Sequence, residues 1–203
     1  MKVLTQFTLL FLLCFSVLGQ KAAFEIKGKI RGLQDTEVYL SHYFGSNQQV
    51  IKDTARVDAS GSFVFQGNEV LEQGLYLVTF LNNKYFDIVL GNPNFSFETD
   101  TLDIVGSMKI FGSEENEAFY DFQRLMSSTY QKMQGQVAPD QIRSQMMKVQ
   151  VNWVDRYKNL FVSKLIKASF EPEIPPYPKA IKSSKDSADL FKFQYSYYKK
   201  HYF

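Results

Sequence analysis

The sequence predicts an α+β protein: an N-terminal antiparallel β-sandwich or open barrel over residues 20–112, followed by a helical segment over residues 113–203. Up to residue 112, short stretches of alternating apolar and polar residues are separated by Gly, Asn and Pro, as in sandwiches and barrels. From Ser113 the apolar residues recur at helical spacing. We expect a helical hairpin there, then a proline-rich linker at residues 171–178 and a C-terminal helix.

The first 19 residues are typical of a signal peptide rather than of the fold. Lys2 forms a short basic region, residues 3–18 are apolar, and Gly19 suits a cleavage point. The apolar run is short for a membrane span and lacks a stop-transfer flank. Leu13 precedes Cys14, where bacterial lipid attachment requires a small residue, which argues against a lipoprotein. We therefore expect export to the periplasm or cell envelope, with no transmembrane segment in the mature chain.

The clearest strand signal lies in residues 50–67, which we predict to form a β-hairpin. Phe63 and Phe65 share one face of its second strand. Asp58 can cap the turn with its carboxylate, and Gly61 can adopt a positive φ. On the first strand, one face carries Ile51, Asp53, Ala55 and Val57. Further strands are expected at residues 24–30, 37–44, 75–81, 85–90, 95–99, 102–105 and 108–111.

Two helices are expected after the strands. Ser113 is a good N-cap for the first, Gly135 ends it, and Pro139 opens the second. Their apolar stripes indicate core packing in an antiparallel hairpin. The first stripe comprises Phe119, Phe122, Met126, Tyr130 and Met133, and the second comprises Ile142, Met146, Val149, Trp153, Tyr157, Leu160 and Leu165.

The tail, residues 183–203, is predicted to be a third helix capped by Ser184 or Ser187. It is rich in aromatic residues, and no Gly, Asn or Pro follows as a stop signal. One interpretation is that its packing partner lies further along a longer chain, and the other is that the helix folds back onto the first two helices. The candidate docking surface comprises Phe191, Tyr195, Tyr198, Tyr202 and Phe203.

Charge and cysteine content exclude several classes of function. The chain has 23 Lys and Arg against 21 Asp and Glu, a formal charge of +2. This balance argues against nucleic acid as the main partner, because phosphate contacts need concentrated basic charge. Cys14 is the only cysteine and lies in the expected signal peptide, so the mature chain can form neither disulfides nor a redox pair. The aromatic content of 16% is typical of strands and cores.

Few residues are candidates for chemistry. His42 and His201 are the only histidines, and neither has the spacing of a zinc or triad site around it. Asp100 and Asp103 could be paired carboxylates, but at a strand–turn boundary we expect turn caps. Residues 58–61 lack the alternating acidic ligands of a calcium loop, and no glycine-rich phosphate loop is present. The sequence predicts no catalytic residue, no cofactor and no metal, so we expect a non-enzyme.

The chain resembles the N-terminal half of exported thioredoxin-like proteins of Bacteroidetes, in which domain of unknown function 4369 precedes helices and often a thioredoxin fold. The resemblance covers roughly residues 21–125. The redox domain of that family, with its cysteine pair, has no counterpart in these residues, so thiol–disulfide exchange cannot be assigned to any of them. The matching residues are Phe24-x-Ile26-x-Gly28-x-Ile30-x-Gly32, Val38-Tyr39-Leu40, Asp53-Thr54-x-x-Val57-Asp58-x-x-Gly61-x-Phe63-x-Phe65, Gly74-x-Tyr76 and Gly112-Ser113-x-x-Asn116-x-x-Phe119.

This resemblance implies a non-catalytic module that positions or docks a protein partner or a downstream thioredoxin-like domain. The alternative is a stand-alone envelope sandwich that binds a small ligand or glycan. An envelope hydrolase that uses Asp100, Asp103 and His42 is a third hypothesis.

Overall fold

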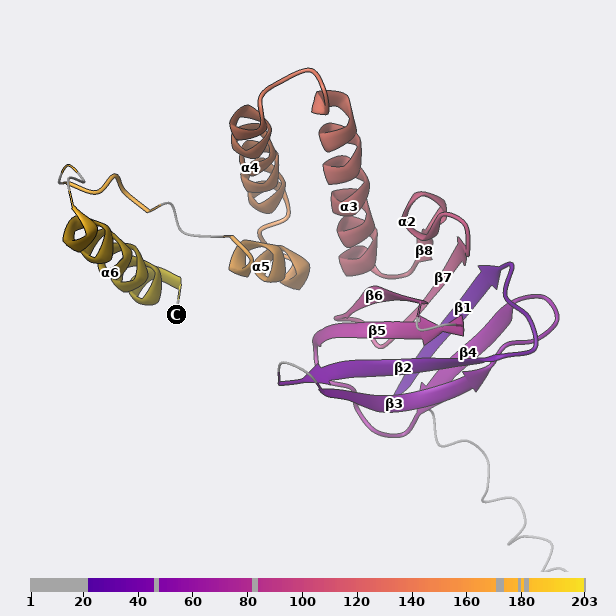
Figure 1. Ribbon diagram of the computed structural model, residues 1–203. Helices are drawn as coiled ribbons and strands as arrows, with labels where there is room; N and C mark the ends of the chain where they lie inside the picture. The colour runs from indigo at the N-terminus through magenta and orange to yellow at the C-terminus, as the bar shows by residue number, and fades with distance from the viewer. Residues whose placement is uncertain are drawn as a thin grey trace, which may run out of the picture.

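The computed structural model describes residues 22–45, 48–81, 84–170, 174–178, 180 and 183–202. Two four-stranded sheets lie face to face in the N-terminal half, and helices follow them, which confirms the predicted α+β class (Figure 1). The predicted signal peptide, residues 1–19, lies outside the described residues.

The strands form two separate sheets. The first sheet has the order β4-β1-β7-β8 and the second the order β3-β2-β5-β6. Every neighbouring pair of strands is antiparallel except β1 and β7, which run parallel. The alternation of apolar residues along a strand does not show whether its neighbour is parallel, so this pair could not be predicted from the sequence. The strands are β1 (Phe24–Arg31), β2 (Glu37–Phe44), β3 (Gln48–Arg56), β4 (Ser62–Gly67), β5 (Gly74–Phe80), β6 (Lys84–Leu90), β7 (Asn94–Asp100) and β8 (Lys109–Phe111).

The predicted hairpin at residues 50–67 is wrong in its pairing. β3 pairs with β2 and β4 pairs with β1, so the turn at 58–61 crosses from one sheet to the other. The reason is that Val57 and Phe65 both point into the space between the sheets, where both are buried. Ile51 was also placed wrongly: a bulge beside Ser41 shifts the register, and Ile51 is 58% exposed.

The turn itself is built as the residue types predict. The Asp58 carboxylate accepts hydrogen bonds from the Ser60 hydroxyl and from the backbone N–H groups of Ser62 and Ser60. These contacts lower the pKa of Asp58 below its ordinary value, with the Ser60 hydroxyl contributing most. Gly61 has φ +83°, a left-handed conformation that favours glycine.

Phenylalanines fill the core between the sheets. Phe63 meets Phe65 and Phe97 edge to face, with ring centroids 5.2 and 5.9 Å apart, and Phe86 meets Phe97 at 5.4 Å. Part of the high aromatic content thus serves core packing.

Five helices are described: α2 (Ile104–Ser107), α3 (Glu114–Met133), α4 (Pro139–Arg156), α5 (Phe161–Ala168) and α6 (Ser184–Tyr202). The strand predicted at residues 102–105 is wrong, because the Asp103 side chain accepts from the Gly106 N–H and starts α2 instead. The N-cap of α3 is Ser113, as predicted.

The second predicted helix is divided into α4 and α5, with a turn at residues 157–160. The later part of its apolar stripe, from Trp153 to Leu165, nevertheless packs in a core as expected. Trp153 is buried against Phe122 and Tyr157, with ring centroids 4.9 and 4.6 Å away. This second core also includes Val89 of β6, so α3, α4 and α5 cover the outer face of the second sheet near its β6 edge.

Candidate functional site

Asn116 attaches the helices to the sandwich. β6 is the edge strand of the second sheet, so its outward backbone groups lack a neighbouring strand. The Asn116 amide replaces that strand at one residue. Its Oδ1 accepts from the Val89 N–H at 2.8 Å, and its Nδ2 donates to the Val89 carbonyl at 2.8 Å. The Asn116 side chain is fully buried, so these bonds fix the first turn of α3 on the sheet edge.

Glu115 and Tyr120 extend this attachment. The Glu115 carboxylate accepts from the backbone N–H groups of Phe161 and Val162, at 2.8 and 2.7 Å. It thereby caps α5, which explains why a new helix starts at Phe161. The Tyr120 hydroxyl donates to the Asp87 carbonyl at 2.8 Å. Burial, and then the charge of Asp87, raise the pKa of Tyr120. These contacts join the sandwich and α3–α5 into one unit, which we call the base.

Asp87 provides a pH-dependent test of this junction. Burial raises the pKa of its carboxyl above the ordinary value, so its charge opposes folding at neutral pH. Asp87→Asn should therefore raise the urea midpoint at pH 7. As the pH falls, Asp87 of the folded wild type binds a proton before the unfolded chain does. The difference in urea midpoint between the variant and the wild type should therefore shrink as the pH falls through the raised pKa to the ordinary value. Exposed Asp155→Asn is the control, and a midpoint lowered at pH 7 by Asp87→Asn would contradict this account.

The predicted docking surface lies on α6, which stands apart from α3, α4 and α5 (Figure 1). Phe191 and Tyr195 are 70% and 60% exposed, and Tyr198, one further turn along, is half-buried. Their spacing places the three side chains on one face of the helix. The side chains of Tyr202 and Phe203 lie outside the described residues. The helix is capped by Ser183 rather than by Ser184 or Ser187, because the Ser183 Oγ accepts from the Asp186 N–H.

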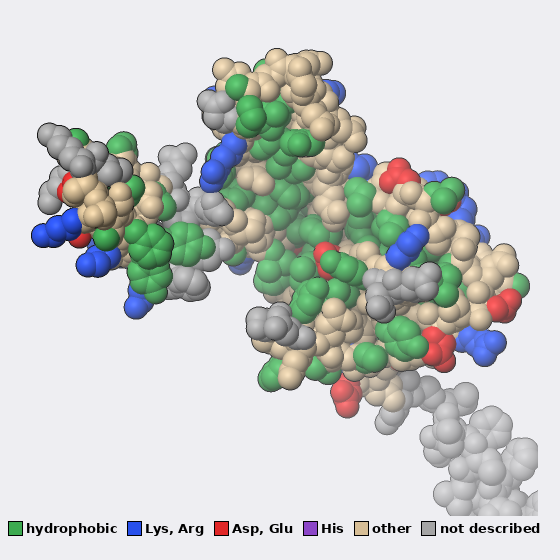
Figure 2. All heavy atoms as spheres, viewed as in Figure 1, with side chains coloured by type: hydrophobic (Ala, Val, Ile, Leu, Met, Phe, Trp, Pro, Cys, Tyr) green, Lys and Arg blue, Asp and Glu red, His purple; other side chains and the backbone are tan. Residues whose placement is uncertain are grey.

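A second candidate surface, of mixed character, lies between α3 and α4 beside the end of α5. Figure 2 shows hydrophobic side chains gathered on this face. The surface forms a groove of about 500 Å³. The groove is lined by Met126, Arg143, Met146, Met147, Gln150, Ser169 and Phe170. Helical spacing predicts core positions for Met126 and Met146, but both are only half-buried in this groove.

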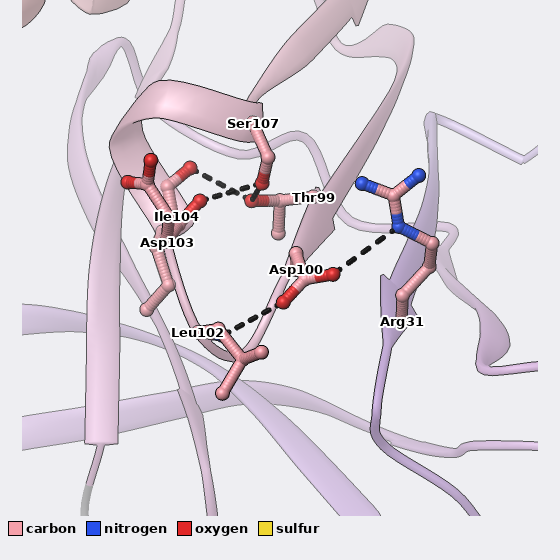
Figure 3. A network of polar contacts seen from close by, with 7 residues as sticks. All are labelled: Arg31, Thr99, Asp100, Leu102, Asp103, Ile104 and Ser107. Atoms are coloured by element: carbon pink, nitrogen blue, oxygen red, sulfur yellow. Dashed lines mark hydrogen bonds and ion pairs between the residues drawn. The ribbon is translucent and has the colours of Figure 1, made fainter.

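Asp100 and Asp103 act as turn caps, as expected. Figure 3 shows the contacts of Asp100. The Asp100 carboxylate accepts from the Leu102 N–H at 2.8 Å and from the Arg31 Nε at 3.3 Å. The Asp103 carboxylate accepts from the Gly106 N–H at 2.9 Å.

The two histidines are the remaining candidate residues. The His42 ring packs against Tyr76 with centroids 5.7 Å apart. His42 lies in the second sheet and Asp100 in the first. The side chain of His201 lies outside the described residues. Where the structure describes the chain, it shows no group of three His, Cys, Asp or Glu side chains that could hold a metal ion. Over the same residues, no helix has the length and apolar character that crossing a membrane requires.

Sequence reasoning missed a basic cluster on the outer face of the first sheet. Lys27, Lys29 and Arg31 occupy the outward positions of β1, and Lys109 lies two strands away on β8. The alternation of basic residues between the inward residues of β1 was a usable signal. The position of β8 near β1 could not be predicted from the sequence, because it depends on the parallel pairing of β1 with β7.

Comparison with protein families gives a match that covers the sandwich. Residues 24–119 match the family model described as Domain of unknown function (DUF4369). The match extends from the first strand into α3 and so includes Asn116. Neither the comparison with curated proteins nor that with solved structures found a match.

Proposed function

We propose that this chain is the non-catalytic N-terminal interaction and positioning module of a cell-envelope thioredoxin-like protein. The observation that carries the proposal is the exposed aromatic face of α6, where Phe191 and Tyr195 extend from a helix that lies away from the base. Aromatic side chains spaced by one turn are typical anchors for a helix that docks against a protein surface.

The roles divide between the base and α6. The sandwich with α3–α5 is fixed internally by Asn116 and Glu115, so it forms one support, and α6 follows it along the chain. α6 then contacts a thioredoxin-like domain, either downstream in the same polypeptide or in a partner. Thiol–disulfide exchange would belong to that domain, and the module would act in the periplasm or envelope after removal of residues 1–19.

The proposal predicts that α6 is the main apolar surface of the isolated chain. Phe191→Ser combined with Tyr195→Ser should remove most of the fluorescence of a bound hydrophobic dye. The urea midpoint should barely change, because exposed substitutions usually shift the free energy of unfolding by less than about 0.5 kcal/mol. Val70→Ser, at a residue that is also highly exposed, is the matched control. Dye fluorescence that survives the double substitution, or an unsubstituted chain that binds no dye, would contradict the proposal.

Ligand binding by the sandwich is the second candidate function. It is favoured by two hollows that share residues on the outer face of the first sheet.

A further inference from the structure

We propose that the outer face of the first sheet binds a small acidic sugar, whose phosphate or carboxylate group is held between Lys29, Arg31 and Lys109. This site is separate from α6 and does not depend on the docking role proposed for that helix.

The site begins with a small hollow where β1, β7 and β8 meet the end of α2. Its volume of about 110 Å³ corresponds to roughly four water molecules at liquid density, which suits a single phosphate or carboxylate group. Three cationic side chains and one carboxylate line it, so its charge favours an anion. The lining residues are Lys29, Arg31, Glu98, Thr99, Ser107 and Lys109.

The guanidinium of Arg31 is held in place by one contact, and its other donors remain available to a ligand. Asp100 contacts its Nε at 3.3 Å, and Asp100 is itself fixed by the Leu102 N–H. Figure 3 shows both Nη nitrogens turned away from Asp100, and within the described residues they have no protein partner. Arg31 therefore presents the paired donors that bind planar or tetrahedral oxyanions.

Glu98 is the carboxylate nearest to both lysines in the sheet. In the sheet register Glu98 lies opposite Lys29 on one side and opposite Lys109 on the other. No hydrogen bond or ion pair joins either lysine to another side chain in the described part of the chain. Besides the Ser60 hydroxyl, Lys29 also lowers the pKa of Asp58, which lines the larger hollow described below. Within the small hollow, the three cations still face one lining carboxylate, Glu98.

Hydroxyl groups give the hollow its shape. Thr99 is 1% exposed and donates to the Ile104 carbonyl at 2.7 Å, and Ser107 donates to the Asp103 carbonyl at 2.5 Å. These bonds hold α2 against β7 and use both hydroxyl protons. Recognition of the anion therefore depends on the three cations.

A larger hollow of about 520 Å³ continues across the sheet and shares Lys29 and Glu98 with the small one. It offers the hydroxyl of Ser96 and that of Ser62, which also bonds to the Ser60 hydroxyl. Its lining includes the side chain of Phe111, which is 50% exposed and lies opposite Ser96. Hydroxyls beside an exposed aromatic ring suit a sugar, which has polar edges and an apolar face. The two hollows together define an acidic sugar as the ligand class.

The test is a calorimetric or NMR titration of the full chain with glucose 6-phosphate, glucuronate, inorganic phosphate and uncharged glucose. We expect both acidic sugars to bind saturably and more tightly than glucose, with affinity falling as salt is added. Lys109→Gln and Lys29→Gln should each weaken binding about tenfold, the loss of one charge-assisted hydrogen bond. Lys84→Gln, on the second sheet, is the control and should change nothing.

The outcomes separate the sources of the acid group. Binding of glucose 6-phosphate without glucuronate supports a sugar phosphate, and the reverse supports a sugar acid. Inorganic phosphate that binds as tightly as glucose 6-phosphate would overturn the role of the larger hollow. No saturable binding, or equal affinities in Lys109→Gln and Lys84→Gln with unchanged urea midpoints, would overturn the site. The Phe191→Ser and Tyr195→Ser variant should bind these sugars normally, so failure of one proposal leaves the other standing.

Discussion

Asn116→Ala is expected to lower the free energy of unfolding by about 3 kcal/mol, because two buried hydrogen bonds are lost and both polar groups of Val89 are left without partners. For a chain of this size the melting temperature should fall by about 10 °C. The loss should also release the first turn of α3, so amide exchange should accelerate at Val89 and around the cap of α5. Urea unfolding and hydrogen exchange measure the two effects.

Asn92→Ala is the matched control for this substitution. Its amide also bonds to backbone groups, the Gly112 carbonyl and the Asn94 N–H, but the site is exposed. Its cost should be no more than about 1 kcal/mol. Equal costs for the two variants would show that Asn116 does not attach the helices to the sheet edge.

Gly28→Ala should cost about 2–3 kcal/mol through overpacking of the sandwich core. A Cβ at Gly28 would lie 2.2 Å from the Cζ of Phe63. That ring has little room to move, since it is buried and packs edge to face on Phe65 and Phe97. Urea unfolding measures the loss. Gly74→Ala is the control in another strand, because its Cβ would come no closer than 3.8 Å to Tyr76. Similar losses for both variants would contradict the packing account.

The local parts of the fold could be predicted from residue types. Ser113 and Asp58 cap their segments because their side-chain oxygens reach backbone N–H groups a few residues away. Inward positions such as Ile26 and Phe97 follow from strict alternation. Each of these signals operates over a few residues and needs no knowledge of the rest of the chain.

The parts that depend on distant partners could not be predicted. Nothing within residues 50–67 shows that β3 and β4 separate into two sheets, since both strands present an apolar face in either arrangement. The division between α4 and α5 depends on Glu115, more than forty residues earlier in the chain. The basic hollow likewise requires Lys29 and Lys109 to meet through the β1–β7–β8 order.

The candidate docking surface shows the same division. Helical spacing placed Phe191, Tyr195 and Tyr198 on one face, and their exposure distinguishes α6 from the stripe around Trp153, which is buried. Sequence alone left open whether α6 folds back onto the first two helices. The groove between α3 and α4, with its half-buried methionines, is the surface that α6 would contact in that alternative.

The measurement that tests the central claim most directly is photo-crosslinking in the native envelope. A benzophenone amino acid replaces Tyr195 in the full-length protein, and Tyr85, an exposed tyrosine of β6, is replaced in the control. The account predicts that the probe at residue 195 forms a crosslink to a thioredoxin-like sequence, in the same polypeptide or in a partner, and that the probe at residue 85 does not. Crosslinks from residue 195 only to the groove beside Met126 and Met146, or none above the control, would contradict it.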